Sequence, residues 1–559
     1  MENINNKATV SGYSLVANEL KTQGIKIVYG IMGIPVTQLA YEIQKHNIRY
    51  IGMRNEQAAS IAAGAAGYLT QVPGVCLTVA GPGFTNALAG LANATENSFP
   101  MILISGSSDI EKAGIGQGDF QEFDQITAAK PYAKSTFKAN TIAAIGAVIA
   151  RAVRVSTSGR PGGVYVELPT NVLHETITEI NAEKASRKKI KKIPHTYPSE
   201  KSITYAANLL KNAKKPLIVI GKGAAYSKAE KALKAFVEQT EIPFIPTPMA
   251  KGLISDNHEY SAVAARSLAL GQVDVAILIG GRLNWILQHG TTPKWNTNCK
   301  FIQIDICEDE MDSNLNIEVP IVGDACNVIN KLLENVKKTG YKAPQEWQNL
   351  IKNKVSINTQ KMDQRLLNVA YPMNFTTAFG VVKNVLTEFP ETMIVNEGAN
   401  TLDVARTIIP MYLPRKRLDT GSWGTMGVGM PYSIAAATNS ENLVLAIEGD
   451  AAFGFSGMEI EVICRYKLPV IILIMNNGGI YKGDAKSFYK GDPAPACFIG
   501  NARYDKLIEA FGGKGYNVDN AKRLRTALKE ALAEAKPALI NCTIDPHAGV
   551  ESGHLASHN

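Results

Sequence analysis

The stretch LVLAIEGDAAFGFSGMEIEVICRYKLPVIILIMNNGG (443–479) decides the fold that this sequence predicts. It reads as an apolar run ending in Gly449-Asp450, an amphipathic helix, and a second apolar run ending in Asn476-Asn477. Such continuous apolar runs are typical of parallel strands that are buried on both faces, with the helix as the crossover between them. Because parallel strands joined in this way end at one edge of a sheet, Asp450 and Asn477 are expected to lie close together there.

The same alternation of apolar run and helix pattern recurs along the whole chain. Further runs are CLTVA, MILIS, VYVEL, LIVIG, VAILIG, FIQIDI and MIVNE. A chain of 559 residues is expected to form about three domains. Two polar, lysine-rich gaps, near 180–198 and 336–372, divide it. The sequence therefore predicts an α/β protein of three doubly wound parallel-sheet domains, at 1–185, 196–335 and 370–559.

Composition narrows the class of protein. The chain is 45% hydrophobic and 19% charged, which is ordinary for a globular enzyme. It has no apolar run of about 18 residues and no apolar leader, so neither a membrane nor a secretory pathway is expected. The seven cysteines are scattered, which favours reduced thiols in the cytoplasm over a disulfide framework or a zinc site. The final Ser-His-Asn only remotely resembles a peroxisomal address.

The net charge of +8 comes largely from the basic run RKKIKK at 187–192. It has no interleaved aromatics and is followed by prolines, so we interpret it as a solvated linker and expect no nucleic-acid partner. The positive surplus suits an anionic ligand, such as a nucleotide or a coenzyme A thioester.

The two strand ends within 443–479 carry the residue types of a magnesium and diphosphate site. Mg²⁺ takes a few protein oxygens together with phosphate oxygens, and Asp450 and Asn477 supply such oxygens. Glycines at both ends let the backbone approach a diphosphate closely. The alternative interpretation is an ordinary βαβ unit with turn residues.

Two other regions offer candidate sites. Glu56 stands where the strand IRYIG meets an alanine-rich helix, where an isolated glutamate is usually a helix cap. In the middle of the chain, Lys222, Arg282 and Asp305 follow apolar runs, and with Arg160 they could bind the phosphates and ribose of a nucleotide. The Gly-x-Gly motif here is by itself weak evidence for a nucleotide site, and the alternative interpretation is a spacer domain that binds no ligand.

The Gly-Asp to Asn-Asn unit resembles the motif of thiamine diphosphate enzymes, with Ala451 in place of its third glycine. Longer stretches extend the resemblance over nearly the whole chain, to the branch of oxalyl-CoA decarboxylases and 2-hydroxyacyl-CoA lyases. These stretches are GIMGIPVTQLA, RNEQAAS, SGRPGGVYVELP, GKGAAYS, LNWILQHG, NEGANTLD, NNGGIYKG and HAGVESGH.

The resemblance implies pyrimidine-binding, central nucleotide-binding and diphosphate-binding domains, and the cofactors thiamine diphosphate, Mg²⁺ and ADP. It implies that Glu56 hydrogen-bonds the aminopyrimidine of thiamine diphosphate. The other residues implied to bind thiamine diphosphate are Gly424, Met426, Gly449, Asp450, Ala451, Asn477 and Ile480. The implied ligands of Mg²⁺ are Asp450, Asn477 and Gly479. The residues implied to bind ADP are Arg160, Lys222, Arg282 and Asp305. Taken alone, 421–430 is a glycine-rich turn with a core methionine. The resemblance also implies a dimer or tetramer with active sites between subunits.

The implied reaction cleaves the C1–C2 bond of a 2-hydroxyacyl-CoA through the thiamine ylide, giving formyl-CoA and an aldehyde. Its implied catalytic residues are Glu56, Phe120, Gln121, Tyr481 and Ser552. Phe120-Gln121-Glu122 is similar to the lyase pattern, whereas decarboxylases carry Tyr-Glu-Glu. Phenylalanine offers an apolar wall to the alkyl group of an aldehyde, and glutamine avoids a second negative charge.

Three alternatives stay open. HAGVESGH resembles the closing segment of the decarboxylase, which would release carbon dioxide instead of an aldehyde. A carboligase of the acetolactate synthase type would accept free pyruvate. A nucleotide-binding scaffold without activity would lack Glu56, Asp450 or Asn477, and all three are present.

Overall fold

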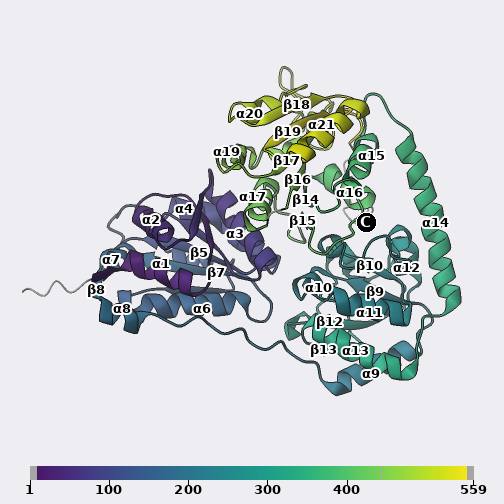
Figure 1. Cartoon of the computed structure of the whole chain (residues 1–559), viewed down its shortest axis with the longest axis horizontal. Coiled ribbons are helices and arrows are strands. Elements are labelled where there is room, and N and C mark those ends of the chain that lie inside the picture. The colour runs from purple at the N-terminus through teal and green to yellow at the C-terminus, as the bar shows by residue number, and fades with distance from the viewer. Residues whose placement is uncertain (1–8, 441, 550–559) are drawn as a thin grey trace, which may run out of the picture. The chain divides into compact units, whose positions relative to one another are not determined.

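The computed structural model describes residues 9–440 and 442–549 and follows the predicted alternation of strands and helices (Figure 1). By its contacts the chain divides into two units. The described part of the first unit comprises 9–193, 423–440 and 455–468, and the second comprises 194–422, 442–454 and 469–549. Two segments from the C-terminal third of the chain thus belong to the unit that the N-terminal third forms.

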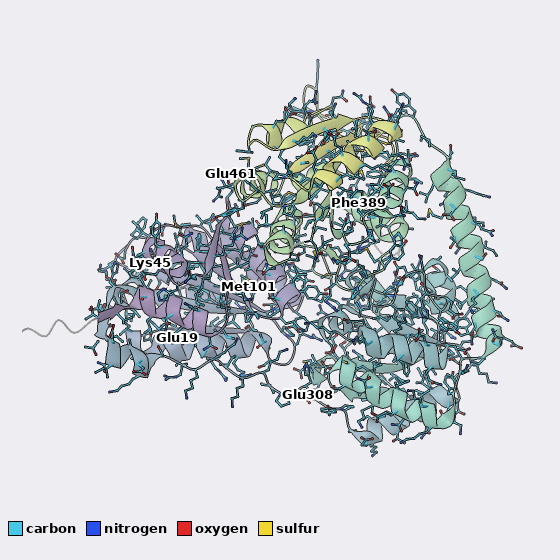
Figure 2. The ribbon with its side chains drawn as sticks, viewed as in Figure 1. Glu19, Lys45, Met101, Glu308, Phe389 and Glu461 are labelled. Carbon is cyan, nitrogen blue, oxygen red and sulfur yellow. The ribbon has the colours of Figure 1, made fainter. Side chains whose placement is uncertain are left out.

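The first unit is built on a six-stranded parallel sheet with the order β3-β2-β4-β5-β7-β6. Its strands are β2 (Ile27–Gly30), β3 (Arg49–Gly52), β4 (Gly74–Thr78), β5 (Met101–Ser107), β6 (Ser135–Lys138) and β7 (Gly163–Pro169). Met101, labelled in Figure 2, begins β5 and is fully buried. A short antiparallel pair, β1 (Thr9–Ser11) with β8 (Thr176–Thr178), joins the two ends of this part of the chain.

Helices cover this sheet. They are α1 (Gly12–Thr22), α2 (Thr37–Lys45), α3 (Glu56–Thr70), α4 (Pro82–Glu96), α5 (Gln125–Ala129), α6 (Ile145–Thr157), α7 (Thr170–His174) and α8 (Glu179–Ala185), with α17 (Gly429–Asn439), α19 (Ile460–Arg465) and the short turns η1 (Ile142–Ala144) and η6 (Gly457–Glu459). The alanine-rich α3 is buried along most of its length and packs against α4 and α17. Small residues permit the close approach of α3 and α4: a Cβ on Gly90 of α4 would meet the hydroxyl oxygen of Ser60 in α3 at 1.9 Å.

The second unit contains two parallel sheets. The five-stranded sheet has the order β10-β9-β11-β12-β13. Its strands are β9 (Pro216–Ile220), β10 (Phe244–Pro246), β11 (Val275–Ile279), β12 (Lys300–Asp305) and β13 (Val319–Val322). Around it lie α9 (Glu200–Lys211), α10 (Lys222–Tyr226), α11 (Glu230–Thr240), α12 (Arg266–Gln272) and α13 (Ala325–Thr339), and the turns η2 (Pro248–Ala250), η3 (Val263–Ala265), η4 (Trp285–Gly290) and η5 (Glu308–Glu310).

The other sheet of this unit has six strands in the order β15-β14-β16-β17-β19-β18. They are β14 (Met393–Glu397), β15 (Arg417–Asp419), β16 (Val444–Gly449), β17 (Val470–Asn476), β18 (Lys514–Val518) and β19 (Ala538–Thr543). Its helices are α15 (Phe375–Leu386), α16 (Ala399–Ile408), α18 (Asp450–Phe453), α20 (Asp505–Glu509) and α21 (Ala521–Glu534). The predicted α/β class with three parallel sheets is therefore confirmed.

The polar stretch 336–372 is mostly one helix, α14 (Gln345–Leu367), which stands out as a long rod in Figure 1. Only Trp347, Gln348 and Ile351 on it are buried. The indole N–H of Trp347 donates to the carbonyl oxygen of Pro216 at 2.8 Å. One buried turn, together with partly buried side chains such as Val355 and Leu366, thus holds a helix whose remaining surface is largely polar.

Candidate active site

Asp450 lies beside the end of the neighbouring strand, where the sequence predicts it. The strands β16 and β17 are adjacent and parallel, with Gly449 opposite Met475. One oxygen of Asp450, Oδ2, accepts the N–H groups of Gly478 at 2.8 Å and Gly479 at 3.1 Å. The other oxygen, Oδ1, accepts the N–H of Ala451 at 2.8 Å.

The Asp450 carboxylate is buried, with 3% of its surface exposed. Burial raises its pKa to about 6, although hydrogen bonds from backbone N–H groups, including those of Ala451, Gly478 and Gly479, act in the opposite direction. A nearby divalent cation favours the ionised form of a carboxylate and would compensate this cost. Asp450 therefore has the chemistry of a metal ligand.

Asn477 supplies a second oxygen at the same edge. Its side-chain nitrogen donates to the carbonyl oxygen of Tyr481 at 2.8 Å, so its side-chain oxygen is the atom suited to a metal. The turn between them requires glycine: a Cβ on Gly479 would meet the carbonyl oxygen of Ala496 at 2.4 Å. Ile480 follows, 42% exposed, and its N–H donates to the same carbonyl at 2.8 Å. The residues present thus fit a hard cation held by few protein oxygens.

Two buried glutamates precede this edge on adjacent strands, since Glu397 of β14 is opposite Glu448 of β16. Burial, reinforced by the charge of Glu397, raises the pKa of Glu448 well above its usual value. Among the described residues, neither carboxyl oxygen of Glu448 has a hydrogen-bond partner. The burial of Glu448 therefore favours its protonated form.

Gly424 and Met426 belong to the first unit, whereas Gly449, Asp450 and Asn477 belong to the second. Gly424 has φ +71° and is exposed, and Met426 is half-buried just before α17. These two residues are therefore placed by a part of the protein different from the one that places the Asp450 edge.

Glu56 is the first residue of α3. Asn55 caps the helix, because its side-chain oxygen accepts the N–H of Gln57 at 2.7 Å. The carboxylate of Glu56 accepts from the side-chain amide of Asn86 at 3.1 Å. A Cβ on Gly83 would lie 3.3 Å from the other carboxylate oxygen, so the first turn of α4 packs closely on Glu56.

The loop GQGDFQEFDQ (116–125) packs on the same turn of α4. A Cβ on Gly81, which has φ +51°, would meet the carbonyl oxygen of Gln121 at 2.8 Å. The side-chain oxygen of Gln121 is buried and has no hydrogen-bond partner among the described residues. Phe120 is 66% exposed. Glu56 and Gln121 therefore contact one short turn, at Gly83 and Gly81 respectively.

Gln125 anchors this loop, and the sequence did not single it out. Its side-chain oxygen accepts the N–H of Gly81 at 2.8 Å. Its side-chain nitrogen donates to the carbonyl oxygen of Gly106 at 3.0 Å and to the hydroxyl of Tyr165 at 3.1 Å. A glutamine at a helix start carries no signal of such a role; only the folded sheet edge shows it.

The four residues predicted to bind a nucleotide are divided between the two units. Lys222 begins α10, Asp305 ends β12, and the guanidinium of Arg282 donates to the Ser422 hydroxyl at 3.0 Å, all in the second unit. Arg160 lies in the first unit. A Cβ on Gly221 would meet the carbonyl oxygen of Gly280 at 2.2 Å, so the two loops at this sheet edge run in close contact.

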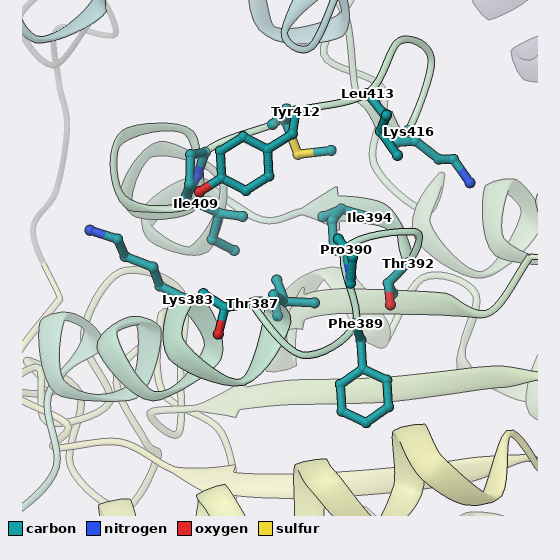
Figure 3. A pocket seen from close by; sticks show the side chains of 13 residues that line it. Lys383, Thr387, Phe389, Pro390, Thr392, Ile394, Ile409, Tyr412, Leu413 and Lys416 are labelled. Carbon is teal, nitrogen blue, oxygen red and sulfur yellow. The ribbon is translucent and has the colours of Figure 1, made fainter. Parts of the chain in front are cut away.

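A pocket of the second unit opens between α15 and the chain that follows α16 (Figure 3). Its lining is mostly apolar. The two lysines at it are engaged, Lys383 with Asp363 at 3.5 Å and Lys416 with Glu391 at 3.1 Å. It includes none of the predicted site residues.

Ser552, the last predicted catalytic residue, lies outside the described residues. No helix in the described part of the chain is long and apolar enough to span a membrane.

Comparison with known proteins agrees with this arrangement. Residues 10–128 match the N-terminal TPP binding domain of thiamine pyrophosphate enzymes, 203–332 the central domain, and 397–542 the C-terminal TPP binding domain. Oxalyl-CoA decarboxylase of Escherichia coli (strain K12) is 50% identical, over 98% of this chain and 97% of the relative. The 2-hydroxyacyl-CoA lyase of Arabidopsis thaliana is 46% identical over 99% and 98%, and 2-hydroxyacyl-CoA lyase 1 of Homo sapiens is 44% identical over 96% and 95%. The predicted resemblance is confirmed: the chain belongs to the thiamine diphosphate-dependent enzymes, in the family that contains the 2-hydroxyacyl-CoA lyases and the oxalyl-CoA decarboxylases.

Proposed function

We propose that this protein is a 2-hydroxyacyl-CoA lyase, which splits a 2-hydroxyacyl-CoA into formyl-CoA and an aldehyde and catalyses the reverse condensation. The observation that carries the proposal is the loop that contains Phe120 and Gln121, because its Gln121 packs on the turn of α4 that also contacts Glu56. The exposed ring of Phe120 supports an apolar wall for the alkyl group of the aldehyde. The buried, unpartnered oxygen of Gln121 supports a hydrogen bond to a substrate hydroxyl.

In this proposal thiamine diphosphate, when bound, supplies the electron sink that accepts the electron pair of the broken C1–C2 bond. Asp450, Asn477 and Gly479 hold Mg²⁺ and with it the diphosphate. Glu56 hydrogen-bonds the aminopyrimidine, and Gly424 and Met426 fix its position. Tyr481 moves protons beside the substrate. The support for these roles is the Asp450 edge and the setting of Glu56 described above.

The active form in this proposal is a dimer or a pair of dimers, in which one chain supplies Glu56 and another supplies Asp450. Its support is the exposure, in the single chain, of three large apolar side chains of the first unit. Trp423 is 52% exposed, Phe455 66% and Met458 56%. Exposed apolar area of this kind marks protein–protein contact.

We further propose that ADP binds at the carboxyl edge of the five-stranded sheet. Lys222 and Arg282 would hold its phosphates, and Asp305 its ribose; Arg160 is the fourth candidate. The close approach of Gly221 to Gly280 supports a phosphate-binding loop. A cytoplasmic location completes the proposal, supported by cysteines that are scattered along the sequence without a CxxC pair. Fractionation of cells for the protein against peroxisomal markers tests the location.

Oxalyl-CoA decarboxylase is the second candidate, favoured by the 50% identity to the Escherichia coli enzyme. A paired assay decides between them. The holoenzyme with Mg²⁺ receives oxalyl-CoA or a 2-hydroxyacyl-CoA at matched concentrations, and formyl-CoA is quantified. A higher kcat/KM for the hydroxyacyl thioester supports the lyase. A preference of tenfold or more for oxalyl-CoA, about 1.4 kcal/mol in barrier, overturns it. Turnover of free pyruvate alone would instead indicate a carboligase.

A further inference from the structure

Glu459 lies against the turn that leads into Glu56. It is the last residue of η6, and 1% of its surface is exposed. Its two carboxylate oxygens accept the backbone N–H of Arg54 at 3.1 and 3.2 Å. It also accepts the backbone N–H of Asn55. One carboxylate thus satisfies two consecutive N–H groups at the start of α3, which no intrahelical carbonyl can reach.

These two N–H groups belong to the residues that set where α3 begins. Asn55 caps the helix through its side chain, and Glu56 is the first helical residue. Asn86 then holds the carboxylate of Glu56. A shift of the 54–55 backbone would therefore move the Glu56 side chain relative to Asn86, because the carboxylate sits directly after the anchored peptide groups.

The surroundings of Glu459 set the pH at which it ionises. Burial raises its pKa to about 7, although bonds from Arg54 and Asn55 and the charges of Arg54 and Arg465 act in the opposite direction. The guanidinium of Arg465 is itself shared with Glu461, at 2.9 and 3.0 Å, and with the carbonyl oxygen of Gly52.

The other elements around Glu459 add few ionisable groups. The helix α17, which contacts η6, contains Tyr432 as its single ionisable residue, and the hydroxyl of Tyr432 accepts from Asn93. Arg49 of β3 lies over the ring of Tyr466, 5.5 Å from its centroid. Arg54 and Arg465 are thus the cations that compete with burial at Glu459.

We propose that Glu459 is a positioning residue for Glu56: its ionised carboxylate holds the 54–55 turn in place, and its protonation releases that turn. An ionised carboxylate only accepts hydrogen bonds, whereas a protonated one presents a donor to backbone N–H groups that need an acceptor. This inference rests on the proposed role of Glu56 in the active site. It predicts activity that rises with pH as Glu459 ionises.

The test compares Glu459→Gln with wild type and with Glu461→Gln. Glu461, labelled in Figure 2, lies two residues after Glu459, and its carboxylate forms an ion pair with Arg465 at 2.9 Å. Amide hydrogen exchange at 54–55 is measured in the holoenzyme without substrate, at pH 5.5 to 8.5, corrected for intrinsic rates. In wild type, protection of these amides should rise by at least tenfold with a midpoint near pH 7. In Glu461→Gln the same rise should occur at a lower pH, because Arg465 loses the carboxylate that it is paired with. In Glu459→Gln the protection should be low at every pH.

The second readout is kinetic. Glu459→Gln should lower kcat by tenfold or more with little change in KM, and should remove the inflection near pH 7 from the pH profile of kcat. Glu459→Asp should restore part of the lost kcat and part of the inflection in the pH profile. A merely structural residue would instead lower the exchange protection of the whole of α3, including the buried 58–68 segment, and leave the shape of the profile unchanged.

The results of the exchange and kinetic measurements separate the role of Glu459 from the proposed function. Exchange at 54–55 that is equal in wild type and Glu459→Gln, or independent of pH in wild type, overturns the inference. If the variant does not fold, the pH dependence of wild-type exchange alone decides. If exchange behaves as expected but no thioester yields formyl-CoA, the anchoring role of Glu459 stands and the proposed function fails.

Discussion

Asp450 and Gly478 are joined by a 2.8 Å hydrogen bond, from the backbone N–H of the glycine to the carboxylate, across the ends of two adjacent strands. The bond brings together two positions 28 residues apart that the sequence marks only by their residue types. It fixes a carboxylate and an amide turn at one sheet edge, which is the arrangement that a cation with a diphosphate requires.

Replacing Asp450 by Asn should abolish binding of Mg²⁺ and lower the affinity for thiamine diphosphate by at least a hundredfold, because the ionised oxygen ligand is lost. Calorimetric titration of thiamine diphosphate, with and without Mg²⁺, measures this. Asp492→Asn, at an exposed position, is the matched control. Cofactor affinity in Asp450→Asn that equals that of the control would show that the metal is held elsewhere.

Asp450 should also make the cofactor-free protein less stable as pH rises. Its folded pKa of about 6 is above the ordinary value of 3.8, so its stabilising contribution is present below pH 3.8 and is lost as pH rises through 6. The loss amounts to about 3 kcal/mol in the free energy of unfolding. Denaturant titrations of wild type and Asp450→Asn from pH 5 to 8 should diverge in favour of the variant. Mg²⁺ with thiamine diphosphate should reverse this for wild type alone.

Gln125→Ala should destabilise the first unit. It removes the side-chain partner of the Gly81 N–H and one hydrogen bond each of the Gly106 carbonyl and of the Tyr165 hydroxyl, which keeps its bond to Ser105. Leaving buried polar groups unpaired costs roughly 3 kcal/mol in total. Chemical denaturation measures the change, with the exposed Gln117→Ala of the same loop as control. Equal denaturation midpoints for Gln125→Ala and Gln117→Ala would contradict the anchoring role of Gln125.

Exchanging Phe120-Gln121 for Tyr-Glu should shift substrate preference towards oxalyl-CoA. The new hydroxyl adds a donor at a position that is 66% exposed, and the second carboxylate disfavours an apolar aldehyde group. We expect the ratio of kcat/KM for oxalyl-CoA over the hydroxyacyl thioester to rise at least tenfold. Phe123→Tyr, 51% exposed in the same loop, should leave the ratio unchanged. An unchanged ratio in the double variant would mean that other residues select the substrate.

A mixed dimer of Glu56→Gln and Asp450→Asn chains should regain activity. If each site combines Glu56 of one chain with Asp450 of another, one of the two sites in the mixed dimer is intact, giving about half of wild-type kcat. Co-expression with two different tags isolates this species, and the two homodimers are the inactive controls. An inactive mixed dimer would place both residues of a site in one chain.

The sequence predicted the features that depend on local pattern. Continuous apolar runs identified the strands, and the pairs Gly449-Asp450 and Asn476-Asn477 identified the ends of two adjacent strands, since both signals lie within short segments. It missed Glu459 and Gln125 because their partners are tertiary: Glu459 is 405 residues from Arg54 in sequence. The helix α14 was missed as an element because its polar surface lacks an apolar stripe.

The assignment of α17 to the first unit sets an order of events during synthesis. The helix α3 ends at Thr70, and α17, which packs against it, begins at Gly429, about 360 residues later. At roughly 5–20 residues per second, a ribosome takes roughly 20–70 s to cover that interval. Throughout it, α4 and the neighbouring strands can already pack on α3, but the face of α3 that α17 covers in the finished protein stays open. The first unit can therefore be completed only after the C-terminal third of the chain has emerged from the ribosome.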